Sequence, residues 1–303
     1  MRLAAAVAVM ATLGAGTGCG KAAAPKGAAS DSVLLGERQA RLDRALANPD
    51  SIDPDKPIAL WRLPNHLKEI SGLALTADGR LLTHGDERGK VFEVDYRRGV
   101  VVKEFTVGSP AVHGDFESIT IVGDTVMLFT SDGVLYRFRE GTDGSVVPYT
   151  TRDTGLGVEC EFEAMAFDAS ADVLLLACKK PHDKALKDSL VIFRLPLTAG
   201  ADGNDQAPSH LAIPVAEVVG ANGWGGFHPS DMTIDPSTGN YVLVASIEKA
   251  MVEITPLGKV IFARPLPRGH DQPEGIAITK DHILIISDEA KGGPARITLY
   301  RWP

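Results

Sequence analysis

The chain lacks the features that suit a protein to nucleic acid, phosphate or zinc. Its 303 residues include 31 Lys and Arg against 39 Asp and Glu, so its formal charge is −8. It contains no Lys/Arg run that would follow a phosphate backbone, no Gly-rich phosphate loop, no paired-Cys zinc spacing and no Gly-x-Ser-x-Gly nucleophile motif. We therefore expect no nucleic-acid partner, and a cationic ligand fits the charge better than an anionic one.

The apolar run near the start, residues 3–13, is too short to span a bilayer as a mature helix. It follows Met1 and Arg2 and has the pattern of an export signal. Residues 16–19 are similar to a bacterial lipobox, which predicts lipidation of Cys19, with ordinary signal cleavage as the alternative. We expect a protein on the periplasmic side of the cell envelope, held at the outer membrane only by a lipid anchor.

Large apolar residues are scarce over residues 20–30, which predicts a tether. Residues 33–47 mix apolar and charged side chains and end at Asn48-Pro49, which predicts a short helix. The sequence therefore divides into a signal peptide with its lipobox Cys (1–19), a tether with a short helix (20–57) and one folded domain (58–303). No further helix is expected after Pro57.

Five copies of one pattern fill the folded domain: a strand, a turn rich in Asp, Gly and Ser, and a second apolar strand. Aligned, one column of the pattern, here called the channel column, holds Ser71, Glu117, Glu163, Ser230 and Glu274. The column two residues earlier, the preceding column, holds Glu69, Asp115, Glu161, His228 and Gln272. Apolar residues alternate with a period of two in every repeat, which is typical of strands. Each repeat has room for four strands except the last, which has three, and residues 58–63 would supply its fourth. This arrangement predicts an all-β, five-bladed β-propeller closed by an N-terminal strand, with six blades as the alternative.

The outer strands of the first four repeats are expected at residues 100–107, 146–151, 210–218 and 259–266. Channel-column positions are 46, 46, 67 and 44 residues apart, so the third repeat carries a surplus. That surplus fits two loops, residues 198–209 and 220–227, and the second contains Trp224. Loops of this kind are predicted to lie over a binding mouth.

Both polar columns should face the central channel, because residues i and i+2 of a strand share a face. Carboxylates close together in a narrow channel must take up protons or bind a cation. Ligands that are all oxygen suit Ca²⁺ better than Zn²⁺. The predicted ligands are Glu117, Glu163 and Glu274, within a wider set of Ser71, Ser230, Glu69, Asp115 and Glu161. A water-filled channel whose carboxylates bond to neighbouring blades is the alternative.

Acidic residues also end the second strands of the repeats, and these turns should share one face of the disc. Asp132, Asp288 and Glu289 are the predicted ligand-binding members. The alternative is that they cap backbone N–H groups, as acidic turn residues commonly do.

Two cysteines lie at the outer ends of one predicted hairpin. Paired positions in a hairpin have a constant sum, and 160 + 178 nearly equals 167 + 173, so Cys160 and Cys178 should lie almost opposite each other. In an exported protein this predicts a disulfide, with two reduced core thiols as the alternative.

The order Ser, Glu, Glu, Ser, Glu in the channel column, with the small residues beside it and Ser287-Asp288-Glu289 near the end, resembles the SdiA-regulated family of bacterial exported proteins. The resemblance covers residues 58–302. It implies a five-bladed propeller, distantly related to NHL-repeat propellers, with a calcium site at Glu117, Glu163 and Glu274. Asp231 departs from the family pattern, which has a small residue after Ser230.

Two functions are consistent with these residues. The first is a monomeric, calcium-binding envelope lipoprotein that binds a small molecule or a protein, with no catalytic residue. The second is a calcium-dependent hydrolase of the lactonase or phosphoesterase type. The five Asn residues miss both columns, and Lys179 and Lys180 are few cations for a phosphate substrate. The binding function is therefore preferred.

Overall fold

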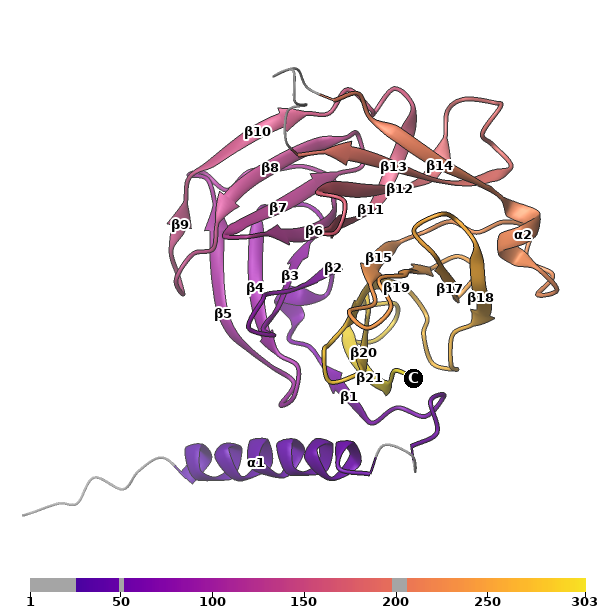
Figure 1. Ribbon diagram of the computed structural model, residues 1–303. Coiled ribbons are helices and arrows are strands. Elements are labelled where there is room, and N and C mark those ends of the chain that lie inside the picture. The colour runs from indigo at the N-terminus through magenta and orange to yellow at the C-terminus, as the bar shows by residue number, and fades with distance from the viewer. Residues whose placement is uncertain (1–25, 49–51, 198–205) are drawn as a thin grey trace, which may run out of the picture.

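Five sheets stand around one axis in the computed structural model, which describes residues 26–48, 52–197 and 206–303 (Figure 1). This confirms the predicted five-bladed β-propeller. The predicted signal peptide, Cys19, the first part of the tether and most of the loop 198–209 lie outside the described residues.

Each blade has its first strand nearest the axis, where it contacts the first strands of both neighbouring blades. Blade 1 consists of β2 (Ile70–Leu75), β3 (Leu81–Gly85), β4 (Lys90–Asp95) and β5 (Val100–Val107). Blade 2 consists of β6 (Phe116–Val122), β7 (Thr125–Thr130), β8 (Val134–Arg139) and β10 (Tyr149–Asp153). Blade 3 consists of β11 (Cys160–Asp168), β12 (Val173–Pro181), β13 (Ser189–Pro196) and β14 (Ser209–Pro214). Blade 4 consists of β15 (Asp231–Ile234), β16 (Tyr241–Ala245), β17 (Ala250–Ile254) and β18 (Val260–Pro265).

Blade 5 is built from both ends of the domain. It contains β19 (Pro273–Ile278), β20 (Ile283–Asp288) and β21 (Arg296–Arg301), and β1 (Ala59–Arg62) completes it. β1 runs antiparallel to β21, with Ala59 opposite Leu299 and Arg62 opposite Arg296. The N-terminal strand therefore closes the ring as predicted, and it covers a sheet edge that would otherwise be open to other chains.

The outer strand expected at 146–151 is split between two blades. β9 (Val146–Val147) pairs in parallel with β5 of blade 1, and β10 then returns to blade 2. Pro148 lies between them and has no N–H to continue either ladder, which explains the break. Blades 1 and 2 are thus joined by main-chain hydrogen bonds at their outer edges.

A short helix, α2 (Val215–Val219), follows β14, so the expectation of no further helix was wrong. The predicted strand 210–218 ends at Pro214, whose fixed φ of −51° leads into the first helical turn. Gly220 ends the helix with a φ of 52°. Asn222 then donates hydrogen bonds of 3.0 Å to the carbonyls of Val219 and Ala263, which ties the following loop to blade 4.

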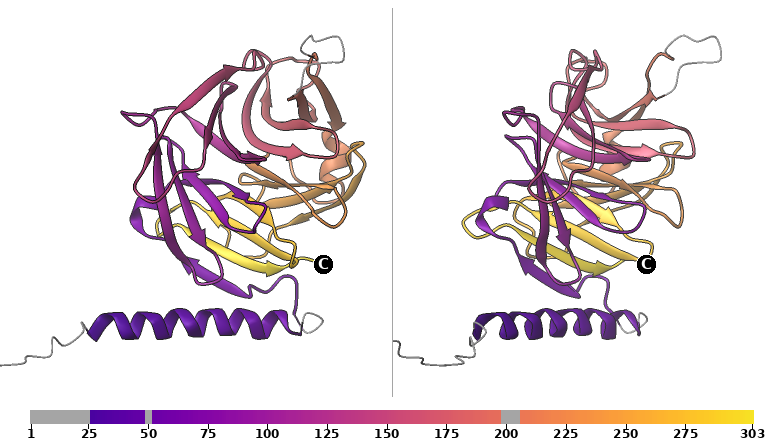
Figure 2. Two further views of the ribbon diagram at one scale, coloured as in Figure 1. Left: turned by 60° about the vertical axis from the view of Figure 1, so that its left-hand side comes forward. Right: turned by 90° about the vertical axis from the view of Figure 1, so that its left-hand side faces the viewer.

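Helix α1 (Lys26–Leu46) begins earlier than the predicted 33–47 and lies along the rim of blades 1 and 5 (Figures 1 and 2). Its Leu42 is 1% exposed and packs with Trp61 and Tyr96. The Arg38 guanidinium lies 5.0 Å from the centre of the Trp61 ring and donates to the Arg98 carbonyl at 2.9 Å. No helix among the described residues is both long enough and apolar enough to cross a bilayer.

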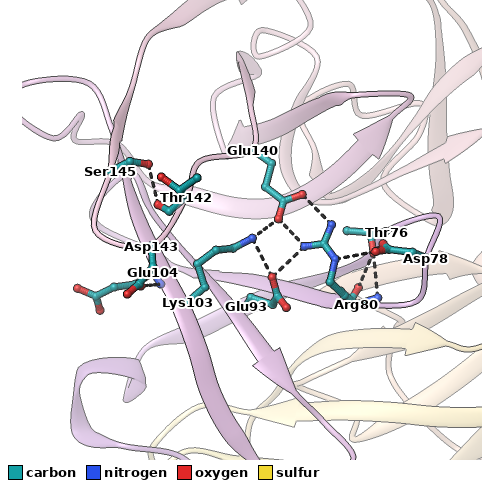
Figure 3. Close-up of polar contacts among 10 residues, drawn as sticks. All are labelled: Thr76, Asp78, Arg80, Glu93, Lys103, Glu104, Glu140, Thr142, Asp143 and Ser145. Carbon is teal, nitrogen blue, oxygen red and sulfur yellow. Dashed lines mark hydrogen bonds and ion pairs between the residues drawn. The ribbon is translucent and has the colours of Figure 1, made fainter.

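An ion-pair network joins blades 1 and 2 near β9 (Figure 3). Arg80 lies 2.8 Å from Glu93 and 2.5 Å from Glu140, and Lys103 contacts the same two carboxylates. Glu93 lies on β4 and Lys103 on β5, both in blade 1, whereas Glu140 follows β8 of blade 2. Because these groups are partly buried, they depend on each other for charge balance.

We expect Arg80→Met to lower the free energy of unfolding by about 2 kcal/mol, because two partly buried carboxylates keep only Lys103 as a partner. Arg139→Met is the matched control, since Arg139 and its partner Asp124 are 75% and 82% exposed. It should change the free energy by less than about 0.5 kcal/mol. Urea unfolding measures both, and equal effects would contradict the importance of the network.

The predicted disulfide between Cys160 and Cys178 is confirmed, with their Cα atoms 5.8 Å apart. It joins β11 to β12, where Phe162 faces Cys178 and Cys160 faces Pro181. The register of this pair shifts on both sides of Phe162. The disulfide therefore ties the two strands together where their pairing is least regular.

Candidate functional site

The three glutamates of the channel column occupy the same kind of backbone irregularity. The ladder between the first and second strands skips Glu117, Glu163 and Glu274, so each is the extra residue of a β-bulge. Blade 1 has a similar shift around Ser71. A bulge redirects a side chain, and bulges commonly lie next to binding sites. The repeated pattern in the sequence thus encodes a repeated bulge.

These glutamates line one cavity of about 180 Å³ on the axis, at the face where first strands begin and second strands end. We call it the acidic cavity. Its walls carry seven carboxyl groups and one ammonium group. The charged members are Glu69, Asp86, Asp115, Glu117, Glu163, Glu274 and Glu289, with Lys179.

The three bulge glutamates have different partners. Glu163 is paired with the Lys179 ammonium, and Glu274 accepts a 3.0 Å hydrogen bond from the Ser246 hydroxyl. The carboxyl group of Glu117 has no hydrogen-bond donor among the described residues, although it is partly buried. Glu117 is therefore the carboxyl with the greatest need of a proton or an external cation.

Burial raises the pKa of Glu117 to about 9, and the charges of Glu163 and Asp115 add to the effect. Burial likewise raises the pKa of Glu274 to about 7. Burial raises the pKa of Glu163 as well, although Lys179 opposes the shift. When no cation is bound, some of the carboxyl groups in the cavity are therefore protonated at neutral pH.

The two serines of the channel column hold neighbouring blades together. Ser71 Oγ donates to the Glu117 carbonyl at 3.0 Å, and Ser230 Oγ donates to the Pro273 carbonyl at 2.7 Å. Each bond crosses from one blade to the next. Their hydroxyls are thus engaged in closing the ring at the positions where the other blades carry glutamate.

Two of the five residues of the preceding column reach the acidic cavity. Glu69 and Asp115 line it, while Gln272 donates to Glu289 and His228 pairs with Glu248. Glu161 lies beside Glu163 on β11 and is partly buried. Of the second predicted ring, the structure thus brings only Glu69 and Asp115 to the acidic cavity.

The three acidic turn residues predicted for the ligand face lie in different settings. Glu289 lines the acidic cavity. Asp288 is fully buried, 2.7 Å from His270 Nδ1 and 3.5 Å from Arg296 Nε. Asp132 is exposed and accepts a 2.5 Å hydrogen bond from Thr130 within its own hairpin. The structure therefore brings only Glu289 to the cavity.

Asp231 links the blades at the axis, a role that the sequence did not reveal. Its Oδ2 accepts from the backbone N of Leu73 at 3.2 Å and of Ile276 at 2.9 Å. Its Oδ1 accepts from Ser118 Oγ at 3.3 Å, and Ser118 Oγ in turn accepts from the Met165 backbone N at 2.9 Å. One carboxyl group on blade 4 thereby connects, directly or through Ser118, to all four other blades.

Asp231 fits because its counterparts in the other blades are small. These positions, the axial column, hold Gly72, Ser118, Ala164, Asp231 and Gly275. A Cβ atom on Gly275 would lie 2.2 Å from Ser287 Oγ and 2.7 Å from Leu73 Cγ. The single large polar residue in a column of small ones was the sequence signal for this contact.

The axial column also separates two cavities. Beyond it lies a second cavity of about 190 Å³, lined by the next residues of the first strands, including Thr120, Met165 and Thr233. The acidic cavity and this neutral cavity lie on opposite sides of the axial column.

The acidic cavity offers donor atoms of the kind that a hard metal ion prefers. Its side-chain ligands are oxygen atoms, which suit a hard cation such as Ca²⁺. As they stand, no three Asp, Glu, His or Cys side chains in the described ranges are grouped as a metal site. The chemistry of the residues thus fits calcium, but their side chains would have to come closer together to coordinate it.

No protein-family model matches the chain, and no curated protein matches it in sequence. Solved structures resemble it in fold. The PQQ-bound aldose sugar dehydrogenase of Streptomyces coelicolor has a TM-score of 0.50 at 14% identity, covering 82% of this chain and 99% of that one. The glutaminyl cyclase of Myxococcus xanthus has a TM-score of 0.51 at 11% identity, covering 80% and 94%. At such identities the likeness shows the propeller fold alone.

Proposed function

We propose that this protein is a binding module of the cell envelope that takes a cation into the acidic cavity, with calcium as the inorganic ion best suited to its donors. The observation that carries the proposal is the Glu117 carboxyl group, which is partly buried beside other carboxyls and has no hydrogen-bond donor in the part of the chain that the structure describes. The resemblance to SdiA-regulated proteins implies calcium at the same three glutamates. Lipidation at Cys19 would anchor the module at the outer membrane, and we expect it to act there as a monomer.

Calcium titration in a calorimeter tests the proposal. We expect wild-type protein to bind one ion, and Glu117→Gln, Glu163→Gln or Glu274→Gln to weaken binding at least about tenfold by removing one negative charge. Glu87→Gln is the matched control, since Glu87 is an exposed carboxyl on the same face. Absence of heat with the wild type, or unchanged affinity in all three cavity variants, would refute the proposal.

Lys179 should act as a built-in competitor for the incoming cation. Its ammonium pairs with Glu163, and although burial lowers its pKa, the hydrogen bond and charge of Glu163 outweigh this and leave the pKa raised. We expect Lys179→Met to bind calcium about tenfold more tightly, because a positive charge leaves the cavity. The exposed Lys180→Met is the control in the same titration. Weaker binding by Lys179→Met would show that Lys179 instead organises the site.

A further inference from the structure

His228, a histidine with an accessible ring, lies just before the first strand of blade 4, at the end of the blade where the other first strands carry the acidic cavity. His228 Nδ1 lies 2.7 Å from Glu248 Oε1, and the His228 backbone N donates to Glu248 Oε2 at 3.1 Å. The Glu248 side chain is 7% exposed, whereas that of His228 is 42% exposed. A carboxylate can only accept, so Nδ1 carries the hydrogen and the lone pair of the neutral ring lies on Nε2.

The chain around His228 also restricts the ring. A Cβ atom at Gly226 would lie 2.9 Å from His228 Cε1, so a side chain at position 226 would displace the ring. Pro229, the next residue, is buried and fixes the chain direction. The ring is therefore positioned by a buried carboxylate on one side and by the main chain on another.

One turn connects this histidine to the acidic cavity. Ser246 in the turn after β16 donates to Glu274 in the cavity, and Glu248, two residues later, holds His228. The Cα atoms of residues two apart are at most about 7 Å from each other, so one short turn carries both the cavity contact and the contact that holds His228. His228 also comes two residues before Ser230 of the channel column.

We propose that His228 is a general base for hydrolysis of esters whose protonated amino group occupies the acidic cavity, an activity that rests on the proposed function. His228 Nε2 takes a proton from a water molecule while the water oxygen bonds to the acyl carbon. The ester C–O bond breaks, and the leaving alkoxide takes the proton from Nε2. The products are a carboxylic acid and an alcohol, and His228 returns to its neutral form. Glu248 is a positioning residue.

Hydrolysis of phenylalanine ethyl ester by the full chain, followed by chromatography, tests this activity. His228→Gln should lower kcat about 100-fold, the usual contribution of a general base. Glu248→Gln should lower kcat with KM unchanged, and nitrogen NMR of the imidazole should show a changed tautomer. The control is His182→Gln, a ring on the same face whose Nδ1 contacts the Val158 carbonyl at 3.1 Å. It should hydrolyse the ester at the wild-type rate.

The acetylated ester, which lacks the positive charge, completes the design. We expect its kcat/KM to be at least about tenfold lower, because the cavity no longer attracts it. Wild-type protein that hydrolyses neither ester, or His228→Gln at the wild-type rate, would overturn the proposal. Calcium calorimetry separates this proposal from the proposed function. Calcium binding without ester hydrolysis would leave the proposed function intact and refute the esterase activity. Equal rates with both esters would refute recognition of the amino group by the acidic cavity.

Discussion

Replacing Asp231 with alanine should lower the free energy of unfolding by about 4 kcal/mol at pH 6, the largest effect we expect from a single substitution. The change leaves the backbone N–H groups of Leu73 and Ile276 without an acceptor in a fully buried place. It also removes one acceptor of the Ser118 hydroxyl, which keeps its contacts with the Met165 backbone on blade 3, so blade 4 loses its link to blades 2 and 3 through Ser118. Chemical denaturation followed by circular dichroism measures the loss.

Asparagine at position 231 separates hydrogen bonding from charge. Its amide oxygen can accept from Leu73 and Ile276 as the carboxylate does, and its NH₂ can donate to Ser118 Oγ. Burial raises the pKa of Asp231 to about 8, although its donors oppose the shift. Asp231→Asn should therefore lose little stability at pH 6 and match or exceed the wild type at pH 9. An Asn variant as unstable as the Ala variant would mean that the negative charge itself holds the blades.

The fold was predictable because every blade repeats the same physical pattern. Period-two strands with Gly and Asp turns fix the blade, and a last repeat one strand short predicts closure by residues 58–63, which form β1. The departures arise where proline interrupts a ladder. Pro148 separates β10 from β9, which pairs with blade 1, and Pro214 precedes helix α2. Neither the pairing of β9 nor the helix follows from the local sequence pattern.

The site was predictable in its columns but not in its contacts. Alignment of the repeats placed Glu117, Glu163 and Glu274 on one face, and the structure lines one cavity with them. Pairings between repeats could not be found in this way, because Lys179 meets Glu163 and Ser246 meets Glu274 only after the sheets assemble. Asp231 stood out in the sequence as the one large polar residue in its column. Only the structure shows that its carboxyl group connects all five blades, directly or through Ser118.

The stability of the cation-free protein should fall as the pH rises from about 5 to 9, because the folded state keeps protons that the unfolded state releases. Burial raises the pKa of Glu117 from an ordinary 4.5 to about 9 and that of Glu274 to about 7. Below pH 4.5 both states are protonated and the contribution of these groups is fully present. Between 4.5 and 9 the folded state binds more protons, so the free energy of unfolding decreases with pH and the contribution is lost as the pH passes the folded values.

Glu117→Gln should remove part of this decline, since a neutral amide replaces the group that ionises last. With a calcium chelator present, the free energy of unfolding should fall by about 2 kcal/mol less between pH 5 and 9 in the variant than in the wild type. This difference is smaller than the full cost of ionising Glu117, because water in the cavity partly screens its charge in the wild type. Glu87→Gln should follow the wild-type curve, since its carboxyl is exposed. Saturating calcium should flatten the wild-type curve in the same way, because a bound cation replaces the protons of the acidic cavity. A Glu117→Gln curve parallel to that of the wild type would show that Glu117 carries no excess proton, and the need for a cation in the acidic cavity would then lose its physical basis.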